Sequence, residues 1–155
     1  MAFDAAAVKS LFDHAQSALL KLGVFETVNT HEPLSAPGNG VRAAMWVDSI
    51  TPQGRASGLA ATSGVVTLLV RCYANALQPE QDAIDPNMLT ATTTVLGAFS
   101  GSFTLGGTVR NIDLLGSYGR ALGAQAGYQT QDSKLFRIIT ITLPVVIDDL
   151  WTQTP

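Results

Sequence analysis

The amino-acid sequence predicts one α+β domain spanning residues 1–155, in which two helices pack on a mainly antiparallel β-sheet with long loops. Apolar residues recur at intervals of three and four near the N-terminus, which is typical of an amphipathic helix, and Asp85-Pro86 is a typical start of a second helix. The segments 65–73 and 134–147 are rich in Val, Ile, Leu and Thr, as strands are. A length of 155 residues is also close to the commonest size of a single domain.

The two predicted helices have recognisable ends. Asp4 can cap the first helix, and Gly23 provides its C-terminal stop. The apolar stripe of this helix consists of Val8, Leu11, Phe12, Ala15, Leu19 and Leu22. The second helix is expected to begin with Asp85 as its cap and Pro86 at its first position, and to run to about Ser100. Its candidate buried residues are Met88, Leu89, Val95, Leu96 and Phe99.

Five segments have strand character, and turn-rich loops separate several of them. The expected strands are residues 24–30, 41–50, 65–73, 108–115 and 134–147. Segment 65–73 is largely apolar on both faces, so we expect a central strand that is covered on both sides. Pro144 should end the pairing of the last strand or place it at an edge, because proline has no N–H for the ladder. The predicted loops are residues 31–40, 51–64 and 116–132, which are longer than the median connection.

The chain is poor in charged residues. Asp, Glu, Lys and Arg make up 14% of it, against about 25% in an average domain. Because the cores of protein interfaces are depleted in charge in the same way, we expect partners to cover part of the surface. A monomer coated with Ser, Thr, Asn and Gln is the alternative. The net charge is −3 and the basic residues are scattered singly, so no cluster could neutralise several phosphates together.

Residues for catalysis or metal binding do not form a pattern. His14 and His31 lack the partners of a nucleophilic site, and no zinc, calcium or phosphate-loop motif is present. A pair such as Asp113 and Asp132 carries no weight among twelve scattered acids. The single cysteine, Cys72, lies in an apolar run, where a buried structural thiol is expected. We therefore predict no enzyme, no metal and no cofactor.

Targeting and membrane segments are not expected. The N-terminus has no basic stretch followed by an apolar one, so we predict no secretory signal. No apolar run approaches the roughly 18 residues of a membrane helix, so a soluble domain without membrane contact is predicted.

The long loops and the strand arginines are the candidate interface residues. Loops 31–40 and 51–64 are expected to contact neighbouring subunits, because they are long and poor in charge. Some of the strand arginines should pair with acids of another subunit, although solvated arginines on a sheet face are an equal alternative. The candidates are Pro33, Leu34, Pro37, Arg42, Pro52, Arg55, Arg71, Arg110, Arg137 and Trp151, the last because it lies in an exposed-looking tail.

Several segments of the chain resemble a known family. The C-terminal run FRIITITLPVVI covers residues 136–147 and is followed by DDLW at 148–151, while residues 109–119 read VRNIDLLGSYG. With the capped N-terminal helix that leads into a strand and a Pro/Gly loop, these segments resemble the tail terminator proteins of long-tailed bacteriophages, also called tail-completion or neck proteins.

The resemblance implies a structural protein of the virion. It implies a hexameric ring at the head-proximal end of the tail tube, which terminates tube growth and joins the tail to the head. The implied partners are further copies of the chain, the tail tube protein and the head–tail connector proteins. DNA would pass through the lumen without specific binding, and the ring would be assembled in the cytoplasm of the bacterial host.

Other functions remain open at this point. Within the same class, the chain could be a head–tail connector, a stopper or a tail tube subunit. A different class is a small ligand-binding domain or enzyme, which would need a deep pocket with convergent polar groups.

Overall fold

The computed structural model describes residues 2–30, 40–54, 57–77 and 81–153, and it confirms the α+β class. Within these residues, seven strands form one sheet in the order β1-β7-β4-β3-β2, and β5 and β6 also pair with β7. The strands are β1 (Ala2–Phe3), β2 (Val28–Asn29), β3 (Arg42–Gln53), β4 (Ala61–Asn75), β5 (Asn111–Ile112), β6 (Gly123–Gln131) and β7 (Lys134–Thr152). β2 runs parallel to β3, and the other pairs are antiparallel.

The first helix forms as the sequence predicts. Helix α1 is Ala5–Lys21, the carboxylate of Asp4 accepts a hydrogen bond from the N–H of Ala7 at 3.0 Å, and Gly23 has φ +71°. This left-handed backbone is the conformation in which glycine commonly ends a helix.

The second helix begins differently from the prediction. Helix α2 is Ile84–Gly101 and follows a short 3-10 turn, Gln81–Ala83. Ala83 is the capping residue and forms no side-chain cap, whereas Asp85 lies inside the first turn and pairs with Arg137. The predicted Asp85 cap is therefore wrong, although an acid in the first turn still interacts favourably with the helix dipole. Leu89, a predicted core residue, is 60% exposed.

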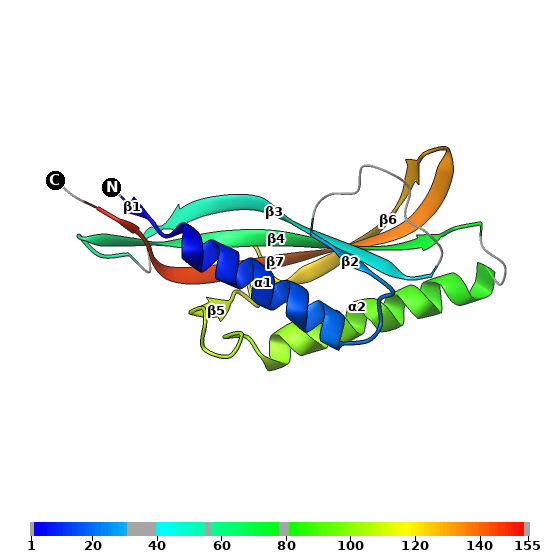
Figure 1. Cartoon of the computed structure of the whole chain (residues 1–155), viewed down its shortest axis with the longest axis horizontal. Helices are drawn as coiled ribbons and strands as arrows, with labels where there is room; N and C mark the ends of the chain where they lie inside the picture. Colours follow the sequence, from blue (N-terminus) through cyan, green and yellow to red (C-terminus); the bar gives the residue numbers. More distant parts are fainter. Residues whose placement is uncertain (1, 31–39, 55–56, 78–80, 154–155) are drawn as a thin grey trace.

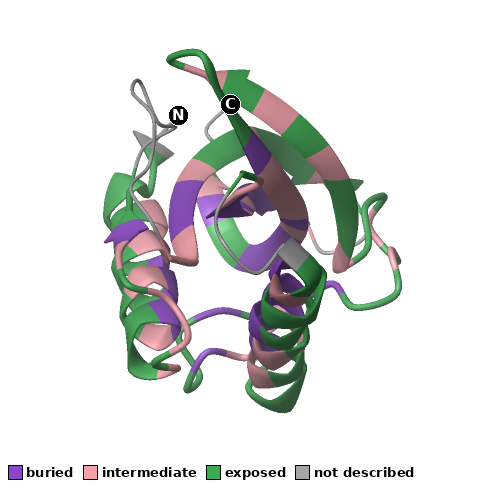
Figure 2. Ribbon diagram, turned by 90° about the vertical axis from the view of Figure 1, so that its right-hand side faces the viewer, coloured by how far each residue is buried: buried purple, intermediate pink, exposed green. Residues whose placement is uncertain are grey.

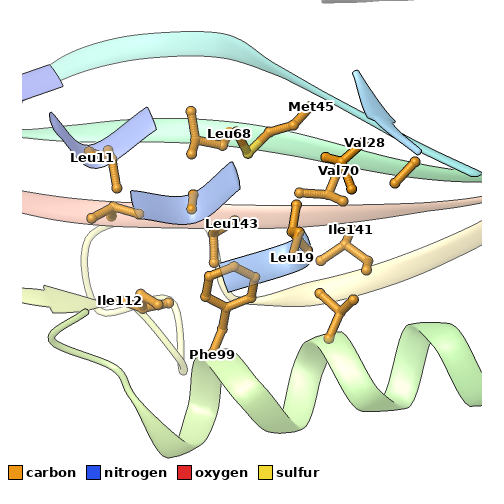
Figure 3. Packing of buried hydrophobic residues seen from close by; sticks show 14 of the residues in the cluster. Leu11, Leu19, Val28, Met45, Leu68, Val70, Phe99, Ile112, Ile141 and Leu143 are labelled. Carbon is orange, nitrogen blue, oxygen red and sulfur yellow. The ribbon is translucent and has the colours of Figure 1, made fainter. Parts of the chain in front are cut away.

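Both helices lie against the same face of the sheet and bury their apolar sides against it (Figure 1). Figure 2 shows the buried residues of each helix turned toward the sheet and the exposed ones turned outward. The core between the layers includes Leu11 and Leu19 of α1, Met88, Val95 and Phe99 of α2, Val66, Leu68 and Val70 of β4, and Ile141 and Leu143 of β7 (Figure 3). Strand β4 lies between β3 and β7, as predicted for a central strand.

The opposite face of the sheet is partly covered by residues 113–122. The main-chain N–H of Asp113 donates to Pro144 on β7, and the side-chain amide of Gln53 on β3 donates to the carbonyl of Tyr118 at 3.0 Å. Because β4 separates β7 from β3, this segment crosses β4. Thr67 and Val65 of that strand, whose side chains face away from the helices, are buried.

Several predicted boundaries are wrong. The predicted strands 24–30 and 108–115 contain only β2 and β5, which are two residues each. The predicted loop 51–64 is strand at both of its ends, since β3 continues to Gln53 and β4 starts at Ala61. The predicted loop 116–132 contains the nine residues of β6, and β1 was also not predicted. β6 consists of Gly, Ala, Gln, Thr and one Tyr, so it lacks the Val and Ile that signal a strand, and pairing with β7 decides its conformation.

Pro144 does not end the last strand. β7 continues to Thr152, and Pro144 stays in register with Thr67 of β4. On its other side, the partner of β7 changes from β6, last paired at Thr142, to β5, first paired at Val145. Proline is tolerated in a strand where no ladder bond to its nitrogen is required, and this gap between two partners is such a position.

Candidate assembly surface

Four of the described arginines are neutralised within the chain. Arg42 pairs with Glu26 at 3.0 Å, Arg110 with Asp148 at 2.9 Å, Arg120 with Asp48 at 2.6 Å and Arg137 with Asp85 at 2.9 Å. Ion pairs as exposed as these typically contribute about 0–1 kcal/mol. The hydrogen bond from Arg110 to Asp148 also raises the pKa of Arg110 above its ordinary value, so this group stays charged. Three predicted interface residues, Arg42, Arg110 and Arg137, thus have acidic partners inside their own subunit.

Arg71 is the exception among the arginines that the structure describes, because it forms no ion pair there. It lies on central strand β4, in register with Ala44 and Thr140, on the face opposite the helices. Its Nε donates to Thr140 Oγ1 at 3.0 Å and its Nη1 donates to Gln129 Oε1 at 3.1 Å. Its guanidinium carbon lies 5.1 Å from the ring centre of Trp46. Uncharged groups of β3, β6 and β7 therefore hold the half-buried guanidinium of Arg71 in place.

The described residues that contact Arg71 are uncharged. A small cluster of buried residues, Ala44, Tyr73 and Phe136, lies on the same face, with Trp46 and Ile138 packed against it. Tyr73 and Phe136 meet edge to face, with ring centres 6.3 Å apart. We call Trp46, Arg71, Gln129, Ile138 and Thr140 the Arg71 face. A guanidinium that is fixed in this way and partly withdrawn from water suits a planar anion such as a carboxylate.

The other predicted interface residues are distributed over the molecule. Pro52 is exposed near the end of β3, opposite Gly64. Trp151 is half-buried in β7, in register with Thr62, and its ring centre lies 5.3 Å from that of Phe3, so the expected exposure of this tryptophan is wrong. Pro33, Leu34, Pro37 and Arg55 lie outside the described residues.

The sequence reasoning missed Trp46, Gln129 and Thr140 as neighbours of Arg71. Strand alternation does place Arg71 and Tyr73 on one face of β4. The register of β4 with β3 and β7, which brings the other residues there, depends on tertiary pairing.

A shallow hollow of about 440 Å³ lies beside β5. Apolar side chains that line it include Phe103, Ile112, Leu114 and Leu115, and Leu115 is 90% exposed. Asp113 at its edge is buried and accepts hydrogen bonds from the N–H groups of Ser117 (2.9 Å) and Tyr118 (2.8 Å). This carboxylate therefore orders the segment 113–122 rather than facing a second acid.

Cys72 is fully buried between the helices and the sheet, as predicted for a structural thiol. Burial raises the pKa of this thiol from 9.0 to about 12, although a hydrogen bond with Thr92 lowers it slightly. The thiol is therefore protonated at neutral pH and is a poor nucleophile.

The raised pKa of Cys72 predicts that the free energy of unfolding depends on pH. Between pH 9 and 12 the unfolded chain loses the Cys72 proton while the folded chain keeps it, so stability falls as pH rises. We expect a slope of about 1.4 kcal/mol per pH unit from this group. Urea titrations at pH 8, 9.5 and 10.5 would measure it. The variant Cys72→Ala is the control, and equal slopes in both proteins would contradict the assignment.

Among the residues that the structure describes, no group of three or more His, Cys, Asp or Glu side chains could hold a metal ion. None of the described helices is both long and apolar enough to span a membrane. A comparison with models of known protein families gave no match, and neither did a comparison with curated proteins. The class that the structure defines is thus an α+β domain with a two-helix layer on one face of an extended sheet.

Proposed function

We propose that this chain is a structural subunit of a long-tailed bacteriophage, which closes with other copies into a six-fold ring at the head-proximal end of the tail tube. There it terminates tube growth and joins the tail to the head-side connector proteins. The proposal draws on the family resemblance of residues 109–119 and 136–151, and on the properties of the Arg71 face.

The observation that carries the proposal is the charge on the Arg71 face. A half-buried guanidinium costs desolvation energy, and a carboxylate is the partner that best offsets it. Among the described residues, Arg71 forms no ion pair with an acid, whereas every other described arginine does. An acid from a neighbouring copy would complete the site. Where that acid lies on a different surface from the Arg71 face, the contact is heterologous, and heterologous contacts close into a ring when the rotation between copies closes.

The electrostatics also suit a DNA conduit. The net charge is −3, and an adjacent acid offsets the positive charge of each of the four paired arginines. DNA would therefore pass through the lumen without being held.

Native mass spectrometry over a concentration series, with and without Mg²⁺ and with tail tubes of the same phage, tests the proposal. A discrete six-fold species, or a ring bound at one end of the tube, is expected. Long polymers of the chain alone would assign it to the tube instead. A chain that neither forms a ring nor binds tubes would contradict the proposal.

The role of Arg71 has its own test. Arg71→Gln removes the charge and should weaken ring formation on the order of tenfold or more, because the acid of the neighbour would be left buried and unpaired. Arg120→Gln is the matched control, since Arg120 is exposed and already paired with Asp48. Equal assembly of the two variants, at unchanged circular dichroism, would exclude Arg71 from the interface.

A further inference from the structure

We propose that the outer strand β6 pairs with β6 of a second copy, antiparallel and across a two-fold axis at Gly127, so that two sheets become one. The pairing concerns the free chain in solution and does not rest on the proposed function. A two-fold contact is complete after two copies, so a ring would have to use another surface.

Among the described strands, β6 forms an open edge of the sheet. It pairs with β7 from Gly123 to Gln131, and no other described strand pairs with it. Most of its side chains are exposed, including Tyr128 at 64%. Figure 2 shows a largely exposed strand at the outer side of the sheet. Its outward N–H and C=O groups can therefore be reached by another strand.

β6 also lacks the features with which monomeric proteins protect such edges. Its sequence, GAQAGYQTQ, contains no charge and no proline, and its register with β7 has no bulge. Part of β3 is open as well, but there the chain has Asp48, Pro52 and a bulge between Val47 and Ser49. Charge, proline and bulges discourage pairing, and β6 has none of them. The favoured position for an added strand is thus β6.

The turn after β6 indicates which main-chain groups face outward. Asp132 and Ser133 form a two-residue turn with φ of +50° and +62°, so Gln131 and Lys134 are the first hydrogen-bonded pair of the hairpin. Because the bonds alternate along an antiparallel pair, the odd-numbered residues of β6 bond to β7. The N–H and C=O groups of Ala124, Ala126, Tyr128 and Thr130 consequently point to the open edge.

A second copy of β6 fits this edge well. Gly127 is the middle residue of the strand, and a two-fold axis there pairs Ala126 with Tyr128 of the other copy, and Ala124 with Thr130. All outward groups are then paired, in about eight main-chain hydrogen bonds. Each large Tyr128 ring meets a small Ala126 side chain, Gln125 meets Gln129, and no two like charges meet. The strand thus complements itself, which is why the partner is another copy.

Disulfide trapping tests both the pairing and its register. Gly127 would face itself in a non-hydrogen-bonded pair with a Cα separation of about 4.5 Å, a distance that a disulfide can span. A Cβ atom at Gly127 meets Ile138 Cγ1 at 3.8 Å, an ordinary contact, so Gly127→Cys should fold. Gly123→Cys is the matched control, because its site is open and it would face Gln131 of the other copy. Native Cys72 is buried and should not react.

Mild oxidation should convert most Gly127→Cys chains to covalent dimers, and Gly123→Cys chains should form at least about tenfold fewer. Equal trapping of the two variants, or trapping of Gly123→Cys alone, would overturn the proposed register.

A second variant tests the pairing without cysteine. Ala126→Pro removes an N–H that points to the open edge and not to β7, so the fold should persist. The dissociation constant of the dimer, measured by sedimentation, should rise on the order of tenfold or more at unchanged circular dichroism. A chain that stays monomeric at millimolar concentration, or a dimer that Ala126→Pro leaves intact, would overturn the proposal.

Discussion

Replacing Phe99 with Ala should lower the free energy of unfolding by about 3–5 kcal/mol. Phe99 is 1% exposed, and its ring extends from α2 toward Leu143 of β7 (Figure 3). Truncation removes the transfer free energy of the ring and leaves a cavity that the two rigid layers can fill only in part. Urea denaturation followed by circular dichroism would measure the change.

Leu89→Ala on the same helix is the matched control. Leu89 is 60% exposed, so this variant should lose less than about 1 kcal/mol. The pair separates packing from helix propensity, because both substitutions introduce alanine into α2. Similar losses in the two variants would mean that the helix is not anchored to the sheet through Phe99.

Replacing Asp113 with Ala should cost about 3 kcal/mol and release the segment 113–122 from the sheet. The buried carboxylate accepts hydrogen bonds from the N–H groups of Ser117 and Tyr118, and hydrogen bonds to a charged group are the stronger kind. Without it, both donors lose their partner. Faster tryptic cleavage after Arg120, together with the loss of unfolding free energy, is the expected result.

Asp48→Ala is the control for this second prediction. It removes the exposed Arg120–Asp48 ion pair, which fastens the same segment to β3, and should cost about 1 kcal/mol or less. If Asp48→Ala loosened the segment as much as Asp113→Ala, the buried carboxylate would not be its main anchor.

The predictions for Phe99 and Asp113 concern the two segments that cover the faces of the sheet. The helices cover one face, and residues 113–122 cover part of the other. The Arg71 face and the open edge of β6 lie outside both of these segments, and they are the two surfaces that we propose for contacts between copies. A variant that loosens the helices or residues 113–122 would lower the stability of the fold and could thereby weaken assembly. The assembly tests therefore compare variants whose fold is unchanged.

Local sequence determined the helices and the central strand. The apolar stripe of α1 follows from the spacing of Leu11, Ala15 and Leu19, and the Asp4 cap and the Gly23 stop are short-range effects of one side chain and one backbone conformation. The buried character of β4 is likewise visible in its residues. The α+β class and the buried Cys72 follow from these patterns.

Only the tertiary structure decided the features that depend on pairing between distant segments. β6 is a strand because β7 supplies its hydrogen bonds, although its own residues favour a loop. Pro144 is tolerated because two different partners of β7 meet beside it. Likewise Arg71 is distinguished from the other described arginines only by its neighbours, since the register of four strands places Trp46, Thr140 and Gln129 around it and no ion pair with a described acid forms. Sequence spacing specifies which residues share a face of one element, whereas strand register specifies which elements meet, and the candidate surfaces arise from the register.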